Sequence, residues 1–356
     1  APRGLTTILK RTVVMKIAIL GASVSAQTIT HNTGEVTGYA EVMRREHTGA
    51  LGACVIKQFT YPGNRLSDGG LLRLEEVLNW GADICLIEPL IEDGRRGKNS
   101  LEVEKRHIYI SLLEAGILPV TVLIPEPFGR SARNLPHYDQ FIGISRQYGL
   151  PVIEVDVADV SDIEEKFSGV HTRLEGARIY ARQIVDALLR LDNPMQRATD
   201  ALAEALKRGR PQLSIAPIPL LTDMPSQVKY LEITIVSRHP ERLPIRLVQH
   251  QDIGKFSPVL DVVLSRHDQG QICSETISIW DEYCHYDRSS YVMLADAVLE
   301  EPGCYTLSLG VSSDHPAYSK CRHPVEEWPK HRYMVPKGPP VLISKLPVET
   351  SGVFGT

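Results

Sequence analysis

Short apolar runs alternate with longer segments of helical periodicity through the first half of the chain, and this alternation constrains the fold most. The runs cover residues 16–20, 54–56, 84–87, 120–124 and 152–155. Unbroken runs of this kind are typical of parallel strands buried on both faces. Helical spacing of apolar residues marks 71–80, 100–115, 138–148 and 174–191. The order predicts an α/β domain, with a parallel sheet and helices on both faces.

The pattern changes after Asn193-Pro194. An alanine-rich stretch at 195–208 predicts a connecting helix, which Gly209 and Pro211 end. Short alternating segments follow at 230–236, 245–250, 259–264, 276–280, 291–294 and 305–311. They predict an all-β domain, most simply a sandwich. The expected division is a leader or tag at 1–14, an α/β domain at 15–191, a linker helix at 192–210, and a β-sandwich domain at 211–356 whose tail from Ala317 is irregular.

Composition excludes several classes of function. The chain has 356 residues, 43% of them hydrophobic, and a net charge of −4, so it holds enough apolar material for a core and has no general basic field for nucleic acid. No apolar run reaches the roughly 18 residues of a membrane-spanning helix, and the leader lacks the apolar core of a signal peptide. We therefore expect a cytoplasmic protein that binds neither nucleic acid nor membrane and can form homo-oligomers.

The six cysteines contain no CxxC pair and are expected to be reduced thiols. A zinc site built from the later cysteines with His285 or His323 is the weaker alternative, because no closely spaced ligand pair anchors it. No cofactor and no metal are expected.

The segment Gly21-Ala22-Ser23-Val24-Ser25 directly follows the first apolar run. Ligands of open parallel sheets bind beyond the carboxyl ends of the strands, so a serine hydroxyl here can project over a cleft. A dinucleotide-binding loop would need glycines in place of Ser23 and Ala26, and a GxSxG nucleophile elbow would need a closing glycine. Ser25 could instead be the N-cap of the following helix.

His171 lies in a glycine-containing loop just before the last helix expected in the α/β domain. From there an imidazole can reach a serine beyond the first strand. A hydroxyl with a base that titrates near neutral pH meets the requirement of nucleophilic acyl chemistry. Without a serine nearby, the simpler interpretation of His171 is a histidine in a surface loop.

Taken in order, four segments resemble the sequence blocks of the SGNH (GDSL-type) hydrolase family. Gly21-Ala22-Ser23 stands where that family has Gly-Asp-Ser, and Gly63 where it has a glycine after the second strand. Leu90-Ile91-Glu92-Asp93 stands in place of Gly-x-Asn-Asp, and Ser168-Gly169-Val170-His171 in place of Asp-x-x-His. The resemblance covers about residues 15–191 and implies a flavodoxin-like α/β fold.

The resemblance also implies roles for single residues. Ser23 would be the nucleophile and His171 the general base. The oxyanion hole would comprise Ser23, Gly63 (with Gly69 as a rival match) and the position of Glu92. Next to it, Asn64 and Arg65 are candidates for substrate contact, as is Arg95 in a basic loop after the third strand.

Three departures from the family pattern bear on mechanism. Ala22 replaces an aspartate, Glu92 replaces the asparagine that donates to the oxyanion, and Ser168 replaces the aspartate that orients the histidine. An ionised glutamate accepts hydrogen bonds only, and losing one oxyanion donor costs about a hundred- to a thousandfold in rate. A missing triad acid costs about ten-thousandfold in a serine triad. A carboxylate from the following set could substitute for it: Asp162, Glu164 and Glu165.

Two functions therefore compete. The first is an acyl ester hydrolase or acyltransferase that works through an acyl-enzyme on Ser23, with a small-molecule or glycan ester, such as an O-acylated carbohydrate, as substrate. The second is a catalytically impaired relative that binds carbohydrate or assists assembly. Aromatic residues of the β domain could offer a sugar-stacking face or simply pack inside it: Trp280, Tyr283, Tyr286 and Tyr291.

Overall fold

A computed structural model describes residues 14–28, 35–62, 65–89, 102–126, 128, 138–217, 228–238, 241–249, 259–278, 290–312, 341–344 and 348–355. The chain divides into two compact units. Among the described residues, the first unit comprises those up to 59 together with 76–89 and 112–204, and the second comprises 60–75, 102–111 and those from 205 onward. The boundaries at 191 and 211 remain a prediction.

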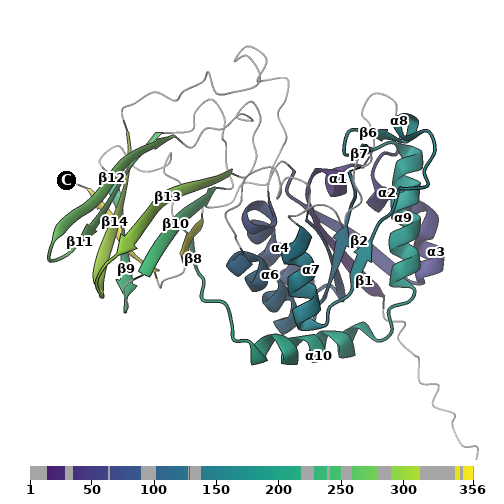
Figure 1. Cartoon of the computed structure of the whole chain (residues 1–356), viewed down its shortest axis with the longest axis horizontal. Helices are drawn as coiled ribbons and strands as arrows, with labels where there is room; N and C mark the ends of the chain where they lie inside the picture. Colours follow the sequence, from purple (N-terminus) through teal and green to yellow (C-terminus); the bar gives the residue numbers. More distant parts are fainter. Residues whose placement is uncertain are drawn as a thin grey trace, which may run out of the picture. The chain divides into compact units, whose positions relative to one another are not determined.

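A five-stranded parallel sheet forms the centre of the α/β part (Figure 1). Its strands are β1 (Met15–Gly21), β2 (Cys54–Thr60), β3 (Ile84–Glu88), β4 (Leu118–Leu123) and β5 (Val152–Glu154). They run in the order β2-β1-β3-β4-β5, which is the flavodoxin-like doubly wound order. Every residue of β3 and β4 is buried, which explains why their sequences are unbroken apolar runs. The predicted fold class is confirmed.

Helices precede and follow these strands. They are α1 (Ser23–Ala26), α2 (Tyr39–Val42), the π-helical turn η1 (Met43–His47), α3 (Thr48–Leu51), the π-helical turn η2 (Leu66–Gly70), α4 (Leu71–Trp80), α6 (Glu102–Glu114), α7 (Tyr138–Tyr148), α8 (Ile163–Lys166) and α9 (Leu174–Leu188). In Figure 1, α7 and α9 lie on opposite sides of the sheet. The doubly wound arrangement therefore covers both faces, as parallel sheets require.

Helix α7 is joined to β4 by polar contacts as well as by packing. The Tyr138 hydroxyl donates to the carbonyl oxygen of Ile124 over 2.8 Å, and the hydroxyls of Thr121 and Ser145 are 2.8 Å apart. Both hydroxyls of the latter pair are buried, so each satisfies the other.

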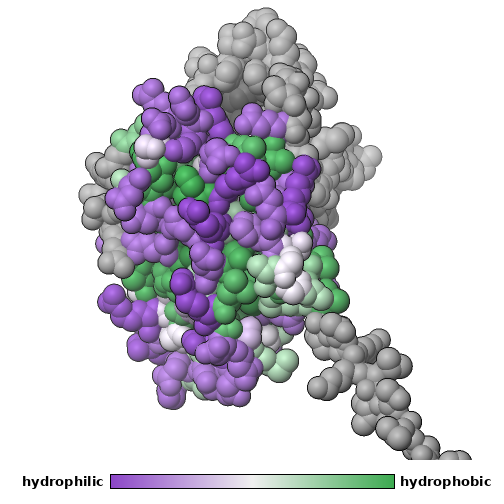
Figure 2. Space-filling model, turned by 90° about the vertical axis from the view of Figure 1, so that its right-hand side faces the viewer, coloured by the Kyte–Doolittle hydropathy of each residue, from purple (hydrophilic) through white to green (hydrophobic). Residues whose placement is uncertain are grey.

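Helix α9 is amphipathic. Its buried stripe faces the sheet domain and consists of Ala177, Tyr180, Ala181, Ile184, Val185 and Leu188. Glu175, Arg178, Arg182 and Asp186 are exposed on the other face. Seen from this side, the described surface is largely hydrophilic, with smaller hydrophobic patches (Figure 2). Among the described residues, no helix is long and apolar enough to cross a bilayer.

One local expectation was wrong. Ser25 is not an N-cap, because α1 begins at Ser23 and Ser25 lies inside it. Its hydroxyl is bound elsewhere, as described below.

The second half contains helix α10 (Pro194–Lys207) and two antiparallel sheets. One sheet has the order β13-β10-β15-β8 and the other β12-β11-β14-β9-β16. Their strands are β8 (Ser214–Pro217), β9 (Val228–Ser237), β10 (Glu241–Gln249), β11 (Val259–Arg266), β12 (Gly270–Ser278), β13 (Ser290–Leu299), β14 (Gly303–Val311), β15 (Val341–Ser344) and β16 (Val348–Gly355).

Each of the six segments predicted as strands in this half overlaps a strand, and residues 250, 279 and 280 of these segments lie outside the described residues. Alternation explains them: in β14, Tyr305, Leu307 and Leu309 are buried and pair with Ile235, Ile233 and Leu231 of β9. The expected irregular tail is wrong for two segments, because β15 and β16 each add a strand to a sheet. That the two sheets pack face to face as a sandwich remains a prediction.

Candidate active site

The turn between β1 and α1 places Ser23 at the carboxyl edge of the parallel sheet. Gly21 ends β1, Ala22 is fully buried, and Ser23 opens α1 with its side chain half-buried. A Cβ on Gly21 would lie 2.2 Å from Ser25 Oγ, so only glycine fits this turn. The local sequence thus fixes where the serine hydroxyl stands.

His171 meets that hydroxyl from a distant part of the chain. It belongs to the short strand β7 (His171–Thr172), which forms a hairpin with β6 (Phe167–Ser168) through a turn containing Gly169 at φ 61°. The His171 Nε2 atom is 3.0 Å from Ser23 Oγ, which is hydrogen-bonding distance. The fold therefore brings together two residues that are 148 positions apart in the chain.

Packing fixes the base of this hairpin. The Arg173 backbone N–H donates to the carbonyl oxygen of Lys166 over 2.9 Å, and the Phe167 ring packs on the Tyr180 ring with centroids 5.5 Å apart. A Cβ on Gly176 would lie 2.4 Å from the Lys166 oxygen, so glycine allows α9 to approach the hairpin closely. The hairpin that carries His171 is therefore packed closely against α9.

A buried polar chain lies beneath the serine turn. The Tyr39 hydroxyl is 2.7 Å from Ser25 Oγ, and Ser25 Oγ donates to Glu88 Oε2 over 2.8 Å. Because the Ser25 proton points to the carboxylate, Tyr39 donates to Ser25. The Ala22 backbone N–H also donates to Glu88 Oε2, over 3.2 Å. Glu88, the last residue of β3, thus binds both the backbone and a side chain of the turn.

The surroundings of Glu88 keep two phenols neutral. Burial raises the pKa of Tyr39 far above its ordinary value, the Glu88 charge raises it further, and the hydrogen bond to Ser25 opposes this. Burial, and then the Glu88 charge, likewise raise the pKa of Tyr180. Both tyrosines therefore serve as uncharged neighbours of a buried carboxylate.

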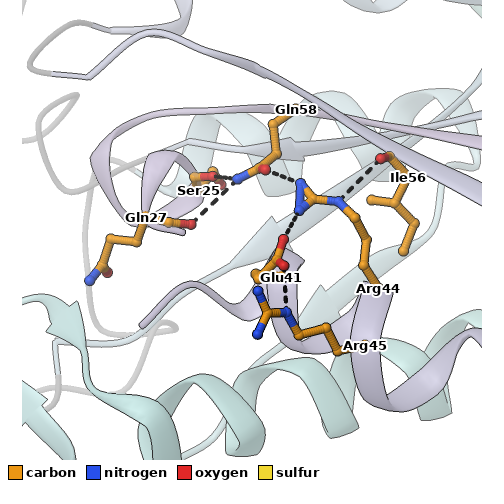
Figure 3. A network of polar contacts seen from close by, with 7 residues as sticks. All are labelled: Ser25, Gln27, Glu41, Arg44, Arg45, Ile56 and Gln58. Atoms are coloured by element: carbon orange, nitrogen blue, oxygen red, sulfur yellow. Dashed lines mark hydrogen bonds and ion pairs between the residues drawn. The ribbon is translucent and has the colours of Figure 1, made fainter. Parts of the chain in front are cut away.

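A second network supports the same turn from β2 (Figure 3). The Gln58 side-chain amide donates to the carbonyl oxygen of Ser25, and its oxygen accepts from Arg44. Arg44 also binds Glu41 and donates to the carbonyl oxygen of Ile56 over 3.3 Å. The turn that carries Ser23 is thus held from β3 on one side and from β2 on another.

Several predicted site residues lie outside the described residues: Gly63, Asn64, Glu92 and Arg95. Arg65 and Gly69 are buried and belong to the second unit. The assignment of these residues to an oxyanion hole or to substrate contact remains a prediction.

The residue that the family resemblance places at the position of the triad acid, Ser168, is among the described residues. Ser168 is exposed and lies directly opposite His171 in the β6–β7 hairpin. The three candidate substitutes, Asp162, Glu164 and Glu165, are also exposed. Together with Phe128 and Ile163 they line an open depression of about 580 Å³.

Sequence reasoning missed Glu88, Tyr39 and Gln27. Glu88 had a usable signal, since it is a carboxylate directly after an unbroken apolar run. Tyr39 and Gln27 had none, because their contacts depend on backbone positions that only the fold brings together.

The arrangement is chemically simple. A hydroxyl and an imidazole nitrogen at hydrogen-bonding distance have the geometry that a nucleophile with a general base requires. Within the described residues, no group of three or more histidine, cysteine, aspartate or glutamate side chains is placed to hold a metal ion.

No family model matches the chain, and no curated protein matches it in sequence. Among solved structures it is similar to a two-domain esterase active on acetylated mannans, crystallised with mannopentaose, at a TM-score of 0.55 and 12% identity. That alignment covers 93% of this chain and 91% of the other.

Two further similar structures span about half of the chain. An esterase from Pseudoalteromonas sp. aligns at a TM-score of 0.41 and 18% identity over 49% of this chain and 96% of its own. An acetylxylan esterase from Geobacillus stearothermophilus aligns at a TM-score of 0.42 and 14% identity over 50% and 95%. The two-domain likeness establishes a shared fold over nearly the whole chain.

Proposed function

We propose that this protein is an esterase that cleaves acyl esters through a covalent intermediate on Ser23. The observation that carries the proposal is the 3.0 Å contact between Ser23 Oγ and His171 Nε2 at the carboxyl edge of a parallel sheet. Ligands bind at that edge in open α/β sheets. The resemblance of the sequence blocks to SGNH hydrolases and the shared two-domain esterase fold support it.

In the acylation step, neutral His171 accepts the Ser23 proton at Nε2 while Oγ attacks the carbonyl carbon of the ester. The tetrahedral intermediate collapses, and the imidazolium gives its proton to the departing alcohol. The carbonyl oxygen needs hydrogen-bond donors during this step. Backbone N–H groups of Ser23 and Gly63 are the proposed donors, because an ionised Glu92 could not donate.

In the deacylation step, His171 removes a proton from water, which attacks the acyl-enzyme and releases the acid. If a sugar hydroxyl takes the place of water, the same intermediate gives acyl transfer. The two reactions share every residue named so far, and they differ only in the acceptor.

The proposed substrate is an O-acetylated carbohydrate. A structure with the same two-part fold is a two-domain esterase active on acetylated mannans, and this chain aligns with it across both parts. In this proposal the α/β part holds the ester.

The direct test uses a fluorophosphonate probe and acetylated substrates. We expect the probe to modify Ser23, as read by peptide mass spectrometry, and we expect acetate release from an aryl acetate and from acetylated mannooligosaccharides. Ser23→Ala should abolish both signals. The matched control is Ser274→Ala, which removes an exposed serine of β12 and should behave as wild type.

The competing function is a binding protein without turnover, and one observation favours it: an exposed serine, Ser168, occupies the position of the triad acid. That function predicts turnover by wild type no faster than by Ser23→Ala on every ester, together with retained affinity for the oligosaccharide. A third outcome would identify a transferase: the probe labels Ser23, but acetyl groups turn over only when a sugar acceptor is added.

A further inference from the structure

The two segments that carry Ser23 and His171 are joined by one side-chain amide. Gln27 Nε2 donates to the carbonyl oxygen of Thr172 over 3.0 Å, and the Thr172 backbone N–H donates to Gln27 Oε1 over 3.0 Å. Gln27 follows α1, and Thr172 is the residue after His171. The amide therefore pairs with the backbone of β7 as a neighbouring strand would.

The Gln27 end of this link is held firmly. The Gln58 amide, itself bound by Arg44, donates to the carbonyl oxygen of Ser25 and lies 3.5 Å from that of Gln27. Figure 3 shows the Gln27 side chain pointing away from this network. Its backbone is thus supported from β2, while its amide is free to reach the histidine segment.

The Thr172 end is also fixed. Its side chain is buried, and its hydroxyl donates to the carbonyl oxygen of Thr37. Successive residues of a strand point to opposite faces, so the burial of Thr172 turns His171 toward Ser23. Contacts that fix the Thr172 backbone therefore also fix the direction in which the His171 imidazole points.

We propose that Gln27 is a positioning residue that sets the distance between His171 and Ser23. A triad acid normally orients the histidine through its ring, and a serine stands at that place here. In this protein, the His171 ring is oriented at least in part through the backbone of Thr172, which the Gln27 amide holds. The proposal rests on the esterase function proposed above.

The test compares two methionine substitutions in the full-length protein. Gln27→Met keeps the side-chain length and removes the two hydrogen bonds to the Thr172 backbone, together with the 3.2 Å contact between the Thr172 hydroxyl and Gln27 Oε1. Gln183→Met is the matched control, because Gln183 makes the same pair of bonds to the backbone of Asp156, at 2.8 and 2.7 Å, away from Ser23. Both variants lose one two-sided amide contact.

We expect kcat on an aryl acetate to fall about tenfold to a hundredfold in Gln27→Met, with KM nearly unchanged, because misplacement by about 1 Å can cost that much. Gln183→Met should keep the kcat of wild type. The pH midpoint of kcat/KM should stay in place in both variants, because a neutral amide alters geometry and adds no charge. A crystal structure of Gln27→Met should show the Ser23 Oγ to His171 Nε2 distance lengthened or heterogeneous.

The outcomes separate the two proposals. Wild-type turnover equal to that of Ser23→Ala overturns the esterase function, and the crystallographic distance then decides the positioning role alone. An unchanged distance with wild-type kcat in Gln27→Met overturns the role of Gln27. Equal losses of kcat in Gln27→Met and Gln183→Met also overturn it, because the effect would then be one of general stability.

Discussion

Gly21 is the residue of the β1–α1 turn where even one added carbon has no room. An alanine Cβ would lie 2.2 Å from Ser25 Oγ, 2.5 Å from Ser25 Cβ and 3.0 Å from Glu88 Oε2. Ser25 and Glu88 are both fully buried, so neither can move aside. We expect Gly21→Ala to lower the free energy of unfolding by roughly 1–3 kcal/mol, as overpacking does, and to lower esterase activity. Urea denaturation and aryl acetate hydrolysis measure the two effects.

The matched control for this substitution is Gly49→Ala. Gly49 lies in α3, is exposed, and an added Cβ would meet nothing within 4 Å. Alanine is more favourable than glycine inside a helix by roughly 0.5–1 kcal/mol, so this variant should be as stable as wild type or slightly more stable. Equal stability of Gly21→Ala and Gly49→Ala would show that the turn is not tightly packed.

Ser168 offers a test of how the histidine is supported. Directly opposite residues of an antiparallel pair have Cβ atoms about 4.5–5.5 Å apart, so a carboxylate at 168 can reach the imidazole of His171. We expect Ser168→Asp to raise the His171 pKa, because a nearby negative charge favours the imidazolium. The acid limb of the kcat/KM profile should then move to higher pH, and kcat on its plateau should rise.

The control places the same charge elsewhere, as Ser274→Asp on β12. It should leave the acid limb where wild type has it. An acid limb that moves while kcat stays the same or falls would indicate that another carboxylate already supports His171, with Asp162, Glu164 and Glu165 as candidates. An unmoved acid limb together with unchanged kcat would show that residue 168 does not reach the ring.

At this scale the sequence predicted the pair but not its supports. Ser23 and His171 could be matched because their residue types and their order along an alternating strand and helix pattern are informative. Gln27 could not be found, because two of its contacts are with backbone atoms of Thr172, which any residue type provides, and the third is with a threonine hydroxyl 145 positions away. Glu88 could have been considered, since a carboxylate that ends a buried strand must find donors.

Among the elements, α2 and η1 join β2 through an ion-paired network that includes Glu41, Arg44 and Gln58. Hydrogen bonds from Arg44 lower the pKa of Glu41 below its ordinary value of 4.5, although burial opposes this. A lowered folded-state pKa gives stability that is present above the ordinary pKa and is lost as the pH falls through the folded-state value. We expect Glu41→Gln to destabilise the protein at pH 7 and to do so less as the pH falls below about 4.5. Urea denaturation at several pH values measures this.

The same substitution in an Arg44→Gln background is the control. There the main cause of the pKa shift is absent and only the 2.6 Å hydrogen bond from Arg45 to Glu41 remains, so the cost of Glu41→Gln should depend less on pH than it does with Arg44 present. If the cost of Glu41→Gln keeps its full pH dependence in the Arg44→Gln background, Arg44 is not the main partner of Glu41.

Elements with a strong period were predictable, and several of the short ones were not. Strands β1, β3 and β4 are apolar because both faces are buried, and α9 repeats its apolar positions for four turns. The segment from α2 to α3 changes helix type at Met43 and again at Thr48, so no single period describes it. Strand β15 has only four residues, which is too short for alternation to be distinguished from a loop.

For the whole molecule, the order along the chain matters. Helix α10 and the residues directly after it come between the part that carries the proposed chemistry and most strands of the antiparallel sheets. Ser23, Gln27 and His171 precede Lys207 in the chain. Ala198, Ala201 and Ala205 of α10 are buried, whereas residues 207–210 are all exposed and Gly209 has φ 81°. Proteases cut exposed, locally unfolded backbone, so the site of cleavage is expected after the helix and not within it.

Among the described residues, brief trypsin treatment should therefore cut first after Lys207 or Arg208, as read by intact mass, because Pro211 protects the bond after Arg210. Fluorophosphonate labelling of Ser23 should persist at the moment of this cut, because the contacts of Ser23, Gln27 and His171 described above all lie on one side of it. A variant with Lys207→Gln and Arg208→Gln should lose the early cut and keep its labelling rate. Early cleavage inside α10, or loss of labelling in step with the cut, would mean that the serine and histidine pair depends on an unbroken connection to the antiparallel sheets.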